Sequence, residues 1–410
     1  MSAANLVGAG LVLLGAVANA PGLVLLGALG LLTSGLSGLW SRRGLDEVHY
    51  ERHLANDRAV WGDSVELAVT IENRKLLPLA WLRADDFATD ETTVREHALI
   101  ASDRPGYAIL RNVWTLAPFE QVRRRFHLEA AHRGLNRFEW VRLSVADLFG
   151  RDAATREEHR PATFLVRPRT VPVRTASGAL APLGSRRARH GLLEDPALFA
   201  GVRPFQPGDP RRRLHERATA RIGRPVSKRF EPSTARQVVI ALDIQTNDDP
   251  YWLLAYDEDL VESLAVAAAS LARRLLADGA AVGVAVNGWT YSPAHTGFVS
   301  ARGGARQLTR IADLLGRTSS VASLPFERMI AGLPGRIPSG TLVISVAARD
   351  LGPALPALRR LRASGFEVRH VAVGPRSRAL AERARRGGIE AVAGHLDPDW
   401  RTSDALTLAG

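Results

Sequence analysis

The chain begins with two apolar runs and then changes to an alternating pattern. Residues 1–41 carry no charged side chain, and residues 6–18 and 23–40 are apolar on either side of an Asn-Ala-Pro-Gly turn. A helix of about 17 residues reaches ~26 Å, slightly less than a ~30 Å hydrocarbon core. Two arginines follow directly, as basic residues do on the cytoplasmic side of a span. The pattern predicts a transmembrane helical hairpin over residues 1–44, which makes the protein a multi-pass protein of the cell membrane with a cytoplasmic body.

Two alternatives to this hairpin remain open. Ala18, Asn19 and Ala20 form a small-x-small site after an apolar run, which is typical of a cleaved signal peptide. A basic segment before the run is absent and a second apolar run follows, so the hairpin is favoured. The second alternative is a helical hairpin buried in a protein core. Whether the first apolar segment is cleaved is left open.

Residues 45–169 follow a period of two. In residues 64–71 the apolar side chains of Val65, Leu67, Val69 and Ile71 alternate with more polar ones and share one face. Further strands are expected at residues 80–82, 122–130 and 138–145. Short alternating strands separated by turns predict an all-β sandwich over residues 45–169.

Strands and helices alternate after residue 236. Residues 237–242, 281–286, 342–346 and 368–373 are continuous β-rich runs, typical of strands that are covered on both faces. Amphipathic helices are expected at residues 260–277, 306–315, 354–363 and 378–386. This alternation predicts a doubly wound α/β domain over residues 236–410. Residues 170–200 are rich in Pro, Ala, Gly and Arg without periodicity and are predicted as a linker, which contains a basic run at 185–190.

Composition removes several classes of function. The sequence has no cysteine, which excludes disulfides, thiolate zinc sites and thiol nucleophiles. It also lacks a phosphate-binding P-loop, a serine nucleophile elbow and an H-E-x-x-H motif, so no catalytic arrangement is predicted. The net charge of +12 favours anionic partners in general. Nucleic-acid binding is disfavoured because no aromatic residues are interleaved with the arginine clusters.

The most distinctive stretch is the arginine-rich segment at residues 199–231. Asp209 is expected to begin a short helix over residues 211–221, in which Arg213, Arg217 and Arg221 would share one face. Arg203 or Arg212 is expected to pair with an acid such as Asp209 or Glu231. The basic residues are therefore interpreted as structural or as a docking surface for an acidic partner.

This segment resembles the signature of the bacterial domain of unknown function 58 family. Two positions depart from the pattern, since Phe205 replaces a tyrosine and Glu216 replaces a tryptophan. The matching residues are Gly201, Val202, Arg203, Pro207, Gly208, Asp209, Arg212, Ala220, Arg221, Gly223, Lys228 and Glu231. On this resemblance, residues 170–235 are a linker and signature segment, with the possible docking residues Arg203, Pro207, Gly208, Asp209, Arg212, Arg213, Arg217, Arg221 and Lys228.

The resemblance also implies a von Willebrand factor A-like C-terminal domain. In such domains a D-x-S-x-S loop after the first strand helps to hold Mg²⁺. Here the loop reads Asp243-Ile244-Gln245-Thr246-Asn247, which keeps only the aspartate. Asp243, Asn247 and Asp350 are thus candidates for a degenerate metal site, and no bound cofactor is predicted.

Members of this family are commonly associated with MoxR-type AAA+ ATPases. The resemblance therefore implies a membrane-anchored, non-catalytic adaptor or scaffold in a chaperone-like assembly with such an ATPase. The alternatives are a nucleic-acid-binding protein and a metal-dependent enzyme that uses the Asp243 loop.

Overall fold

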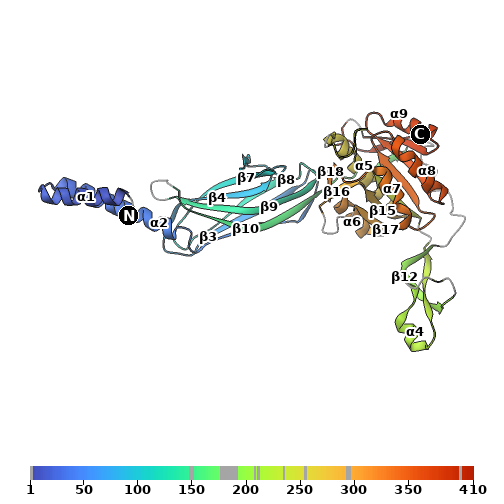
Figure 1. Cartoon of the computed structure of the whole chain (residues 1–410), viewed down its shortest axis with the longest axis horizontal. Helices are drawn as coiled ribbons and strands as arrows, with labels where there is room; N and C mark the ends of the chain where they lie inside the picture. Colours follow the sequence, from blue (N-terminus) through green and yellow to red (C-terminus); the bar gives the residue numbers. More distant parts are fainter. Residues whose placement is uncertain are drawn as a thin grey trace. The chain divides into compact units, whose positions relative to one another are not determined.

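The computed structural model describes residues 3–410 apart from 147–151, 176–192, 207–208, 210–212, 234–235, 254–255, 292–296 and 397–398. The chain divides into two compact units, Met1–Arg167 and Pro168–Gly410. Figure 1 shows the N-terminal unit in blue to green and the C-terminal unit in green to red.

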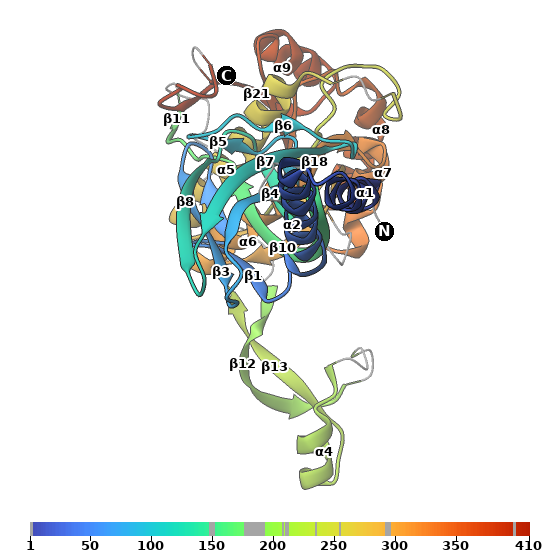
Figure 2. The same ribbon diagram turned by 90° about the vertical axis from the view of Figure 1, so that its left-hand side faces the viewer.

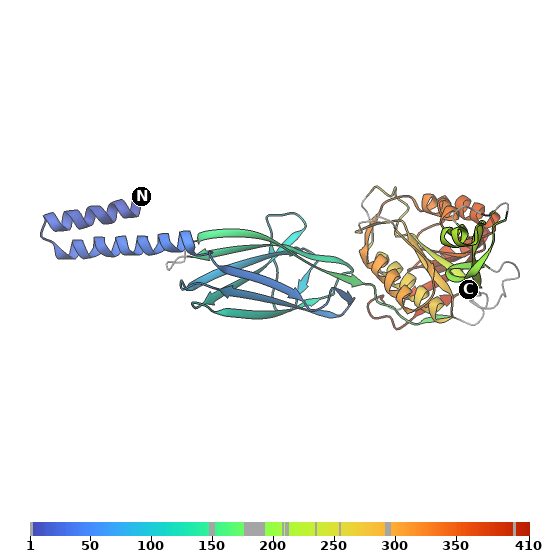
Figure 3. The same ribbon diagram turned by 90° about the horizontal axis from the view of Figure 1, so that it is seen from below.

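The N-terminal unit begins with two helices, α1 (Ala3–Val17) and α2 (Pro21–Arg43). The two helices lie side by side and run antiparallel (Figure 3). Glycines allow a close approach, because a Cβ at Gly15 would lie 2.7 Å from the backbone nitrogen of Val24. At Gly27 a Cβ would lie 2.7 Å from the carbonyl oxygen of Gly8. The helices thus pack backbone against backbone at these positions.

No helix among the described residues is both long enough and apolar enough to cross a membrane. Helix α1 has 15 residues, which corresponds to ~22 Å, well below a ~30 Å hydrocarbon core. Helix α2 is longer, but Thr33, Ser34 and the two terminal arginines interrupt its apolar character. The predicted transmembrane hairpin and the predicted multi-pass membrane localisation are therefore wrong. The contact with the lipid bilayer, which was predicted from the same hairpin, is therefore not supported either.

The rest of this unit consists of two sheets that enclose one core of alternating apolar side chains. Neighbouring strands are antiparallel, except that β2 pairs with β10 in parallel. One sheet has the order β1 (Val48–Leu54), β3 (Ser64–Asn73), β8 (Gln121–Glu129) and β5 (Thr93–Val94). The other has the order β2 (Arg58–Val60), β10 (Asp152–Arg167), β9 (Gly134–Ala146), β4 (Leu79–Thr89), β7 (Tyr107–Leu116) and β6 (Ile100–Ala101).

A buried polar group interrupts this apolar core. Asp86 on β4 accepts hydrogen bonds from the hydroxyl of Tyr50 and, at 2.8 Å, from Arg52 Nη1. The side chains of Asp86 and Arg52 are almost completely buried. Burial raises the pKa of Asp86, and the positive charge of Arg52 opposes the rise. The two sheets are therefore joined by a charge pair inside an otherwise apolar core, since Arg52 belongs to β1 and Asp86 to β4.

The C-terminal unit is built on a mixed sheet of eight strands. Strands β14, β15, β19, β20 and β21 are parallel to one another, whereas β17 runs antiparallel to β15, and β22 runs antiparallel to β21 and parallel to β11. The order is β11 (Val173–Thr175), β22 (Leu406–Ala409), β21 (Glu390–Leu396), β20 (Glu367–Val373), β19 (Leu342–Ala347), β14 (Gln237–Leu242), β15 (Ala281–Val286) and β17 (Phe298–Arg302). The central strands are buried on both faces, as parallel strands covered by helices are.

Helices cover this sheet. Alternate residues of β14, β19 and β20 pack with α7 (Phe326–Ala331), α8 (Leu355–Ala363) and α9 (Ser377–Arg386) in one apolar cluster. Helices α5 (Glu258–Ala277) and α6 (Ala305–Arg317) contact each other, and α5 contacts the same central strands. Two short 3₁₀ turns, η2 (Leu333–Gly335) and η3 (Gly352–Ala354), adjoin α7 and α8. Helices α5, α6, α8 and α9 and strands β14, β15, β19 and β20 agree closely with the ranges expected from the sequence, whereas α7 and β21 were not predicted.

Two small ribbons complete the C-terminal unit. Strands β12 (Leu193–Pro204) and β13 (Val226–Ser233) form an antiparallel hairpin, and α4 (Glu216–Ile222) lies at its turn (Figure 2). Strands β16 (Gly288–Thr290) and β18 (Thr318–Ala322) form the second ribbon, at the carboxyl end of β15. Part of the segment predicted as a linker is thus folded. The basic run at 185–190 lies outside the described residues.

Candidate functional site

The site lies at the point in the eight-stranded sheet where the order of successive strands reverses. Strand β14, the first of the central parallel strands, lies between β15 and β19, and the connections from β15 and β19 leave toward opposite edges of the sheet. In open α/β sheets, ligands bind at the carboxyl ends of the strands at such a switch point. Asp243 directly follows β14, Asn287 follows β15, and Arg349 follows β19 by two residues. The topology therefore brings these three polar side chains to one place.

Both oxygens of the Asp243 carboxylate accept hydrogen bonds. Its Oδ1 accepts from Asn287 Nδ2 at 2.7 Å and from the amide of Gln245 at 3.2 Å. Its Oδ2 accepts from Arg349 Nε at 2.8 Å. Only 1% of the Asp243 side chain and 7% of the Arg349 side chain are exposed. The result is a buried ion pair in which both carboxylate oxygens are engaged.

The neighbouring groups hold this ion pair in position. Asn287 accepts a hydrogen bond from the amide of Ile244 at 2.9 Å, which fixes the orientation of its side-chain amide. Arg349 also donates from Nη2 to the side-chain oxygen of Gln245 at 3.1 Å. Burial raises the pKa of Asp243, while the charge of Arg349 and the amide donors lower it. The side chains of Asp243, Asn287 and Arg349 thus each contact a residue that follows a different strand of the sheet.

The residues at this position do not fit a divalent cation. Mg²⁺ needs free oxygen ligands at ~2.1 Å in octahedral geometry, and it retains several waters. At Asp243 the guanidinium of Arg349 supplies the positive charge instead and engages Oδ2, and two amide N–H groups engage Oδ1. In the described part of the chain, no three acidic or histidine side chains gather as metal ligands would.

The other two metal candidates have different surroundings. Asp350 accepts hydrogen bonds from Arg383 Nη1 at 2.5 Å and from the amide of Gly352 at 3.0 Å. Its pKa is lowered by the Arg383 hydrogen bond against the opposing effect of burial. Asn247 lies in the loop after β14, where it lines a small depression with Tyr251 and Tyr256. The contacts of Asp350 and Asp243 thus join them to different partners, and the predicted set of three does not form one ligand group.

In the signature segment, Arg203 and Asp209 form a bidentate ion pair. The two guanidinium nitrogens lie 2.7 and 2.6 Å from the carboxylate oxygens. Asp209 also accepts from the amide of Gln206 at 2.9 Å and from the hydroxyl of Ser227 at 3.0 Å. The hydrogen bonds from Arg203 lower the pKa of Asp209 far below its ordinary value. The expected pairing of Arg203 with Asp209 is confirmed, and the hydrogen bond from Ser227 links this pair to β13.

The helix in this segment begins later than expected. Asp209 does not cap it. The side chain of His215 accepts from the amide of Ala218 and caps α4, which spans Glu216–Ile222. Arg213 precedes the helix, so the expected face of three arginines is wrong, because only Arg217 and Arg221 lie on α4. The side chains of both are exposed, and that of Lys228 on β13 is partly buried. Pro207, Gly208 and Arg212 lie outside the described residues.

Large apolar side chains are exposed near the Asp243 site. Trp252 is 67% exposed and Trp289 is 53% exposed, and both lie in segments that follow the carboxyl ends of β14 and β15. The aromatic edge, as we name it, consists of Trp252, Leu253, Tyr256, Trp289 and Tyr291, all of which are exposed. Isolated exposed apolar residues are ordinary, but a group of aromatics on neighbouring loops is typical of a protein contact surface.

Arg349 and Asn287 were not predicted as site residues. The metal loop that the resemblance implies is built from oxygen ligands, and an arginine does not match that pattern. A signal was nevertheless present. Asn287 directly follows the apolar strand AVGVAV, and Arg349 is the first charged side chain after LVISVAA, a run that is apolar apart from Ser345. Carboxyl ends of parallel strands meet at one edge of a sheet, so this position alone places the two residues beside Asp243.

Residues 201–323 match the family model described as "Protein of unknown function DUF58". This match supports the family resemblance of the signature segment.

The search of curated proteins finds no match. Among solved structures, the CARDB domain of the PF1109 protein from Pyrococcus furiosus is 12% identical and has a TM-score of 0.20, with 29% of this chain and 86% of that chain covered. A cohesin module from the Clostridium perfringens family 33 glycoside hydrolase is 14% identical and has a TM-score of 0.20, with 29% and 96% covered. A β-glucosidase from Listeria innocua is 16% identical and has a TM-score of 0.19, with 29% and 16% covered. At these TM-scores the likenesses carry no argument about this chain.

Proposed function

We propose that this chain, whose residues 201–323 match the DUF58 family model, is a non-catalytic adaptor with a von Willebrand factor A-like domain. The strand order supports the domain assignment. Counted along the chain, the six strands from β17 to β21 lie in the order 3-2-1-4-5-6, which is the order of doubly wound nucleotide-binding sheets. In this arrangement the aspartate after the first strand stands at the place where the resemblance implies a metal loop.

The Asp243–Arg349 ion pair is the observation that carries the proposal. Enzymes of this fold class place reactive groups or open ligand positions at the strand ends. Here the aspartate at that place has both oxygens engaged, and its counter-charge comes from the chain itself. The edge of the sheet therefore offers no free carboxylate at Asp243. What it does offer is the exposed aromatic edge, which suits contact with another protein.

The partner that we propose is an AAA+ ATPase of the MoxR type, and its support is the family resemblance. Two surfaces of the C-terminal unit are candidates for the contact. One is the aromatic edge. The other is the pair of exposed arginines on α4, Arg217 and Arg221, which lies within the matched segment and suits an acidic surface.

The test is a direct binding measurement between the full chain and a MoxR-type ATPase from the same organism, with ATP and with ADP. We expect saturable binding that differs between the two nucleotides. Reversing the charge of Arg217 and Arg221 to Glu, or replacing Trp252 and Trp289 by Ser, is expected to weaken binding at least tenfold if that surface makes the contact. Arg310→Glu, on the exposed side of α6, is the matched control. Absence of binding with either nucleotide would remove the ATPase from the proposal.

A further inference from the structure

Charge is divided unevenly within the C-terminal unit. Residues 199–230 carry nine arginine and lysine side chains and only two acidic ones. Residues 237–272 carry seven acidic side chains and no lysine, arginine or histidine, although the net charge of the whole chain is +12. Surfaces of opposite charge attract and orient each other during association. These two segments are therefore complementary in charge.

The acidic segment contains one part of the aromatic edge. Asp248 and Asp249 lie exposed in the loop after β14, and Asp249 forms no ion pair with a described residue. Asp248 interacts at longer range with Arg383, whose ion pair is with Asp350. Trp252 follows in the same loop and is 67% exposed. Two carboxylates thus border the apolar surface on this side.

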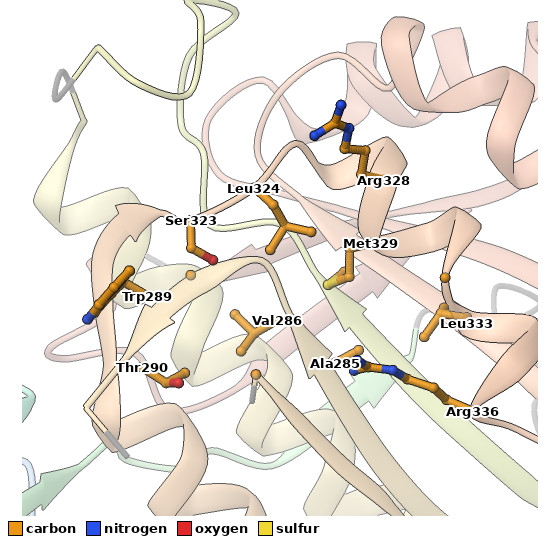
Figure 4. Close-up of a pocket in the computed structure, with 13 residues that line it drawn as sticks. Ala285, Val286, Trp289, Thr290, Ser323, Leu324, Arg328, Met329, Leu333 and Arg336 are labelled. Atoms are coloured by element: carbon orange, nitrogen blue, oxygen red, sulfur yellow. The ribbon is translucent and has the colours of Figure 1, made fainter. Parts of the chain in front are cut away.

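The aromatic edge continues onto the β16–β18 ribbon. Leu253 and Tyr256 line a small depression together with residues of β18, which pairs with β16. Trp289 on β16 is 53% exposed, and Figure 4 shows its ring turned away from the neighbouring pocket. Arg328 and Arg336 lie on the opposite side of that pocket in the same view. The edge therefore has an apolar centre with an acidic border beside the β14 loop, and an apolar centre with a polar rim is the usual composition of a protein contact surface.

The basic segment forms an arm with a matching surface. The basic arm, as we name it, consists of β12, α4 and β13. Arg217 and Arg221 on α4 and Arg224 just after it are exposed, and none of the three forms an ion pair with a described acid. Ile222, which lies between them in the chain, is 48% exposed. The arm thus presents an apolar side chain among positive charges, the counterpart of the aromatic edge with its acidic border.

The two surfaces are connected to opposite ends of the same strand. Strand β13 ends at Ser233 and β14 begins at Gln237, so the basic arm joins the sheet at the amino end of β14. The aromatic edge follows the carboxyl end, and the six residues of β14 separate the two ends by ~20 Å. To reach the edge of its own sheet, the arm must fold back along a helix-covered face. The arm of a second copy can approach the edge directly from solvent.

We propose that the basic arm of one chain docks on the aromatic edge of a second copy. Arg217 and Arg221 pair with the carboxylates of Asp248 and Asp249, and Ile222 packs against the exposed aromatic side chains. The contact joins two different surfaces, so each copy keeps an arm or an edge for a further copy, and assembly proceeds head to tail. The inference goes beyond the adaptor function. Its test contains neither ATPase nor nucleotide, so either proposal can fail without the other.

The first test is sedimentation velocity of the full chain alone over a series of concentrations. We expect association that weakens as salt is added, because exposed charges are screened. The arm variant, Arg217→Glu with Arg221→Glu, is expected to weaken this association about tenfold or more. The edge variant, Asp248→Arg with Asp249→Arg, is expected to do the same. Association that both variants leave unchanged would overturn the proposal.

Combining the reversed charges separates this contact from a general effect of charge. A chain reversed at all four positions is expected to associate again, since the signs are complementary once more. An equimolar mixture of the arm variant and the edge variant is expected to form dimers and nothing larger, because only one intact arm and one intact edge can meet. The matched controls are Arg310→Glu and Asp404→Arg, two exposed positions of the same unit that are expected to leave association unchanged. Failure of both combinations to restore association in folded proteins would contradict pairing between these surfaces.

The absence of native cysteine allows the contact to be located by crosslinking. A chain with Ala220→Cys, at an exposed position of α4, is mixed with a chain with Leu253→Cys on the aromatic edge. A short bismaleimide is expected to link the two into a dimer, and to link the Ala220→Cys chain to an Arg310→Cys chain far less. A chain that carries both Ala220→Cys and Leu253→Cys distinguishes its own arm from that of another copy. Crosslinking within single chains that stay monomeric would show that the arm folds onto its own edge, which would overturn the proposal.

Discussion

The Nε of Arg349 lies 2.8 Å from Oδ2 of Asp243, and both side chains are almost completely buried. The two residues are 106 positions apart in the chain, and β19 brings one to the other. A guanidinium thus neutralises the aspartate at the carboxyl end of the first strand.

Removing one member of this pair is expected to destabilise the C-terminal unit strongly. Arg349→Met leaves the Asp243 carboxylate buried without its counter-charge, which costs about 3–5 kcal/mol. Asp243→Leu combined with Arg349→Met removes both charges, and this double variant is expected to recover much of that loss. Urea unfolding monitored by tryptophan fluorescence measures the effect. A loss below about 1 kcal/mol for the single variant, no larger than that of the exposed control Arg310→Met, would contradict a buried pair.

Magnesium is expected to leave the stability of the protein unchanged. A ligand that binds the native state raises the melting temperature by an amount that grows with the logarithm of its concentration relative to its Kd, and both oxygens of Asp243 are already engaged by donors of the chain. The measurement is the melting temperature with Mg²⁺, with Mn²⁺ and with a chelator. A saturable increase that Asp243→Ala abolishes would show that the cation displaces Arg349.

Stability is expected to fall below neutral pH because of His370. This side chain is fully buried on β20, where its Nδ1 lies 3.0 Å from the hydroxyl of Ser345, and burial lowers its pKa from 6.5 to about 4. The unfolded chain therefore binds a proton near pH 6.5, whereas the folded chain does not until about pH 4. The contribution is present above pH 6.5 and is lost between pH 6.5 and 4, by about 3 kcal/mol for this group. Unfolding free energies of His370→Gln and of the parent chain at pH 7.5 and 5 measure it. A pH slope that is the same in both proteins would exclude His370 as its source.

The pair in the core of the N-terminal unit is expected to be equally sensitive. Asp86→Ala leaves Arg52 buried without its partner and is expected to cost about 3–5 kcal/mol. Tyr50→Phe removes one donor to Asp86 and is expected to cost about 1–3 kcal/mol. Calorimetric melting of both variants, with Tyr107→Phe at a less buried position as the control, tests the ranking. The order would be contradicted if Tyr50→Phe were the more damaging change.

The hairpin of the signature segment is expected to depend on ionised Asp209. Its pKa is lowered by Arg203, so this contribution is present above the ordinary value of 3.8 and is lost as pH falls through the lower, folded value. Arg203→Gln is expected to raise the pKa of Asp209 toward 3.8, as measured by carbon-detected NMR titration of the carboxyl group. An unchanged titration in this variant would mean that the amide of Gln206 and the hydroxyl of Ser227 suffice.

The sequence allowed the parallel strands to be predicted because their signal is local. Residues 237–242 and 281–286 are uninterrupted apolar runs, and β14 and β15 occupy those residues. The alternating run at 64–71 likewise lies within β3. Helix α4 was placed too early because Asp209 is a good capping residue in isolation, whereas in the fold its carboxylate pairs with Arg203. A local propensity was overridden there by a partner six residues away.

The site was predicted only in part, for a similar reason. Asp243 could be located from the strand that precedes it, but the partner that decides its chemistry lies 106 residues further on. The N-terminal hairpin was misjudged on composition. Its two helices are apolar, yet neither combines the length and the hydropathy of a membrane span.

The two ends of the C-terminal unit are joined by a pair of parallel strands. Val173 on β11 is paired with Leu406 on β22, and Arg169 donates to carbonyl groups of the turn at residues 400–403. Since the strands are parallel, the chain enters at one end of the pair and leaves at the other. A pulling force applied between the N-terminal unit and Gly410 would therefore load these hydrogen bonds together, in shear, before the central sheet is disturbed. The short β11–β22 pair would act as the mechanical clamp of the unit.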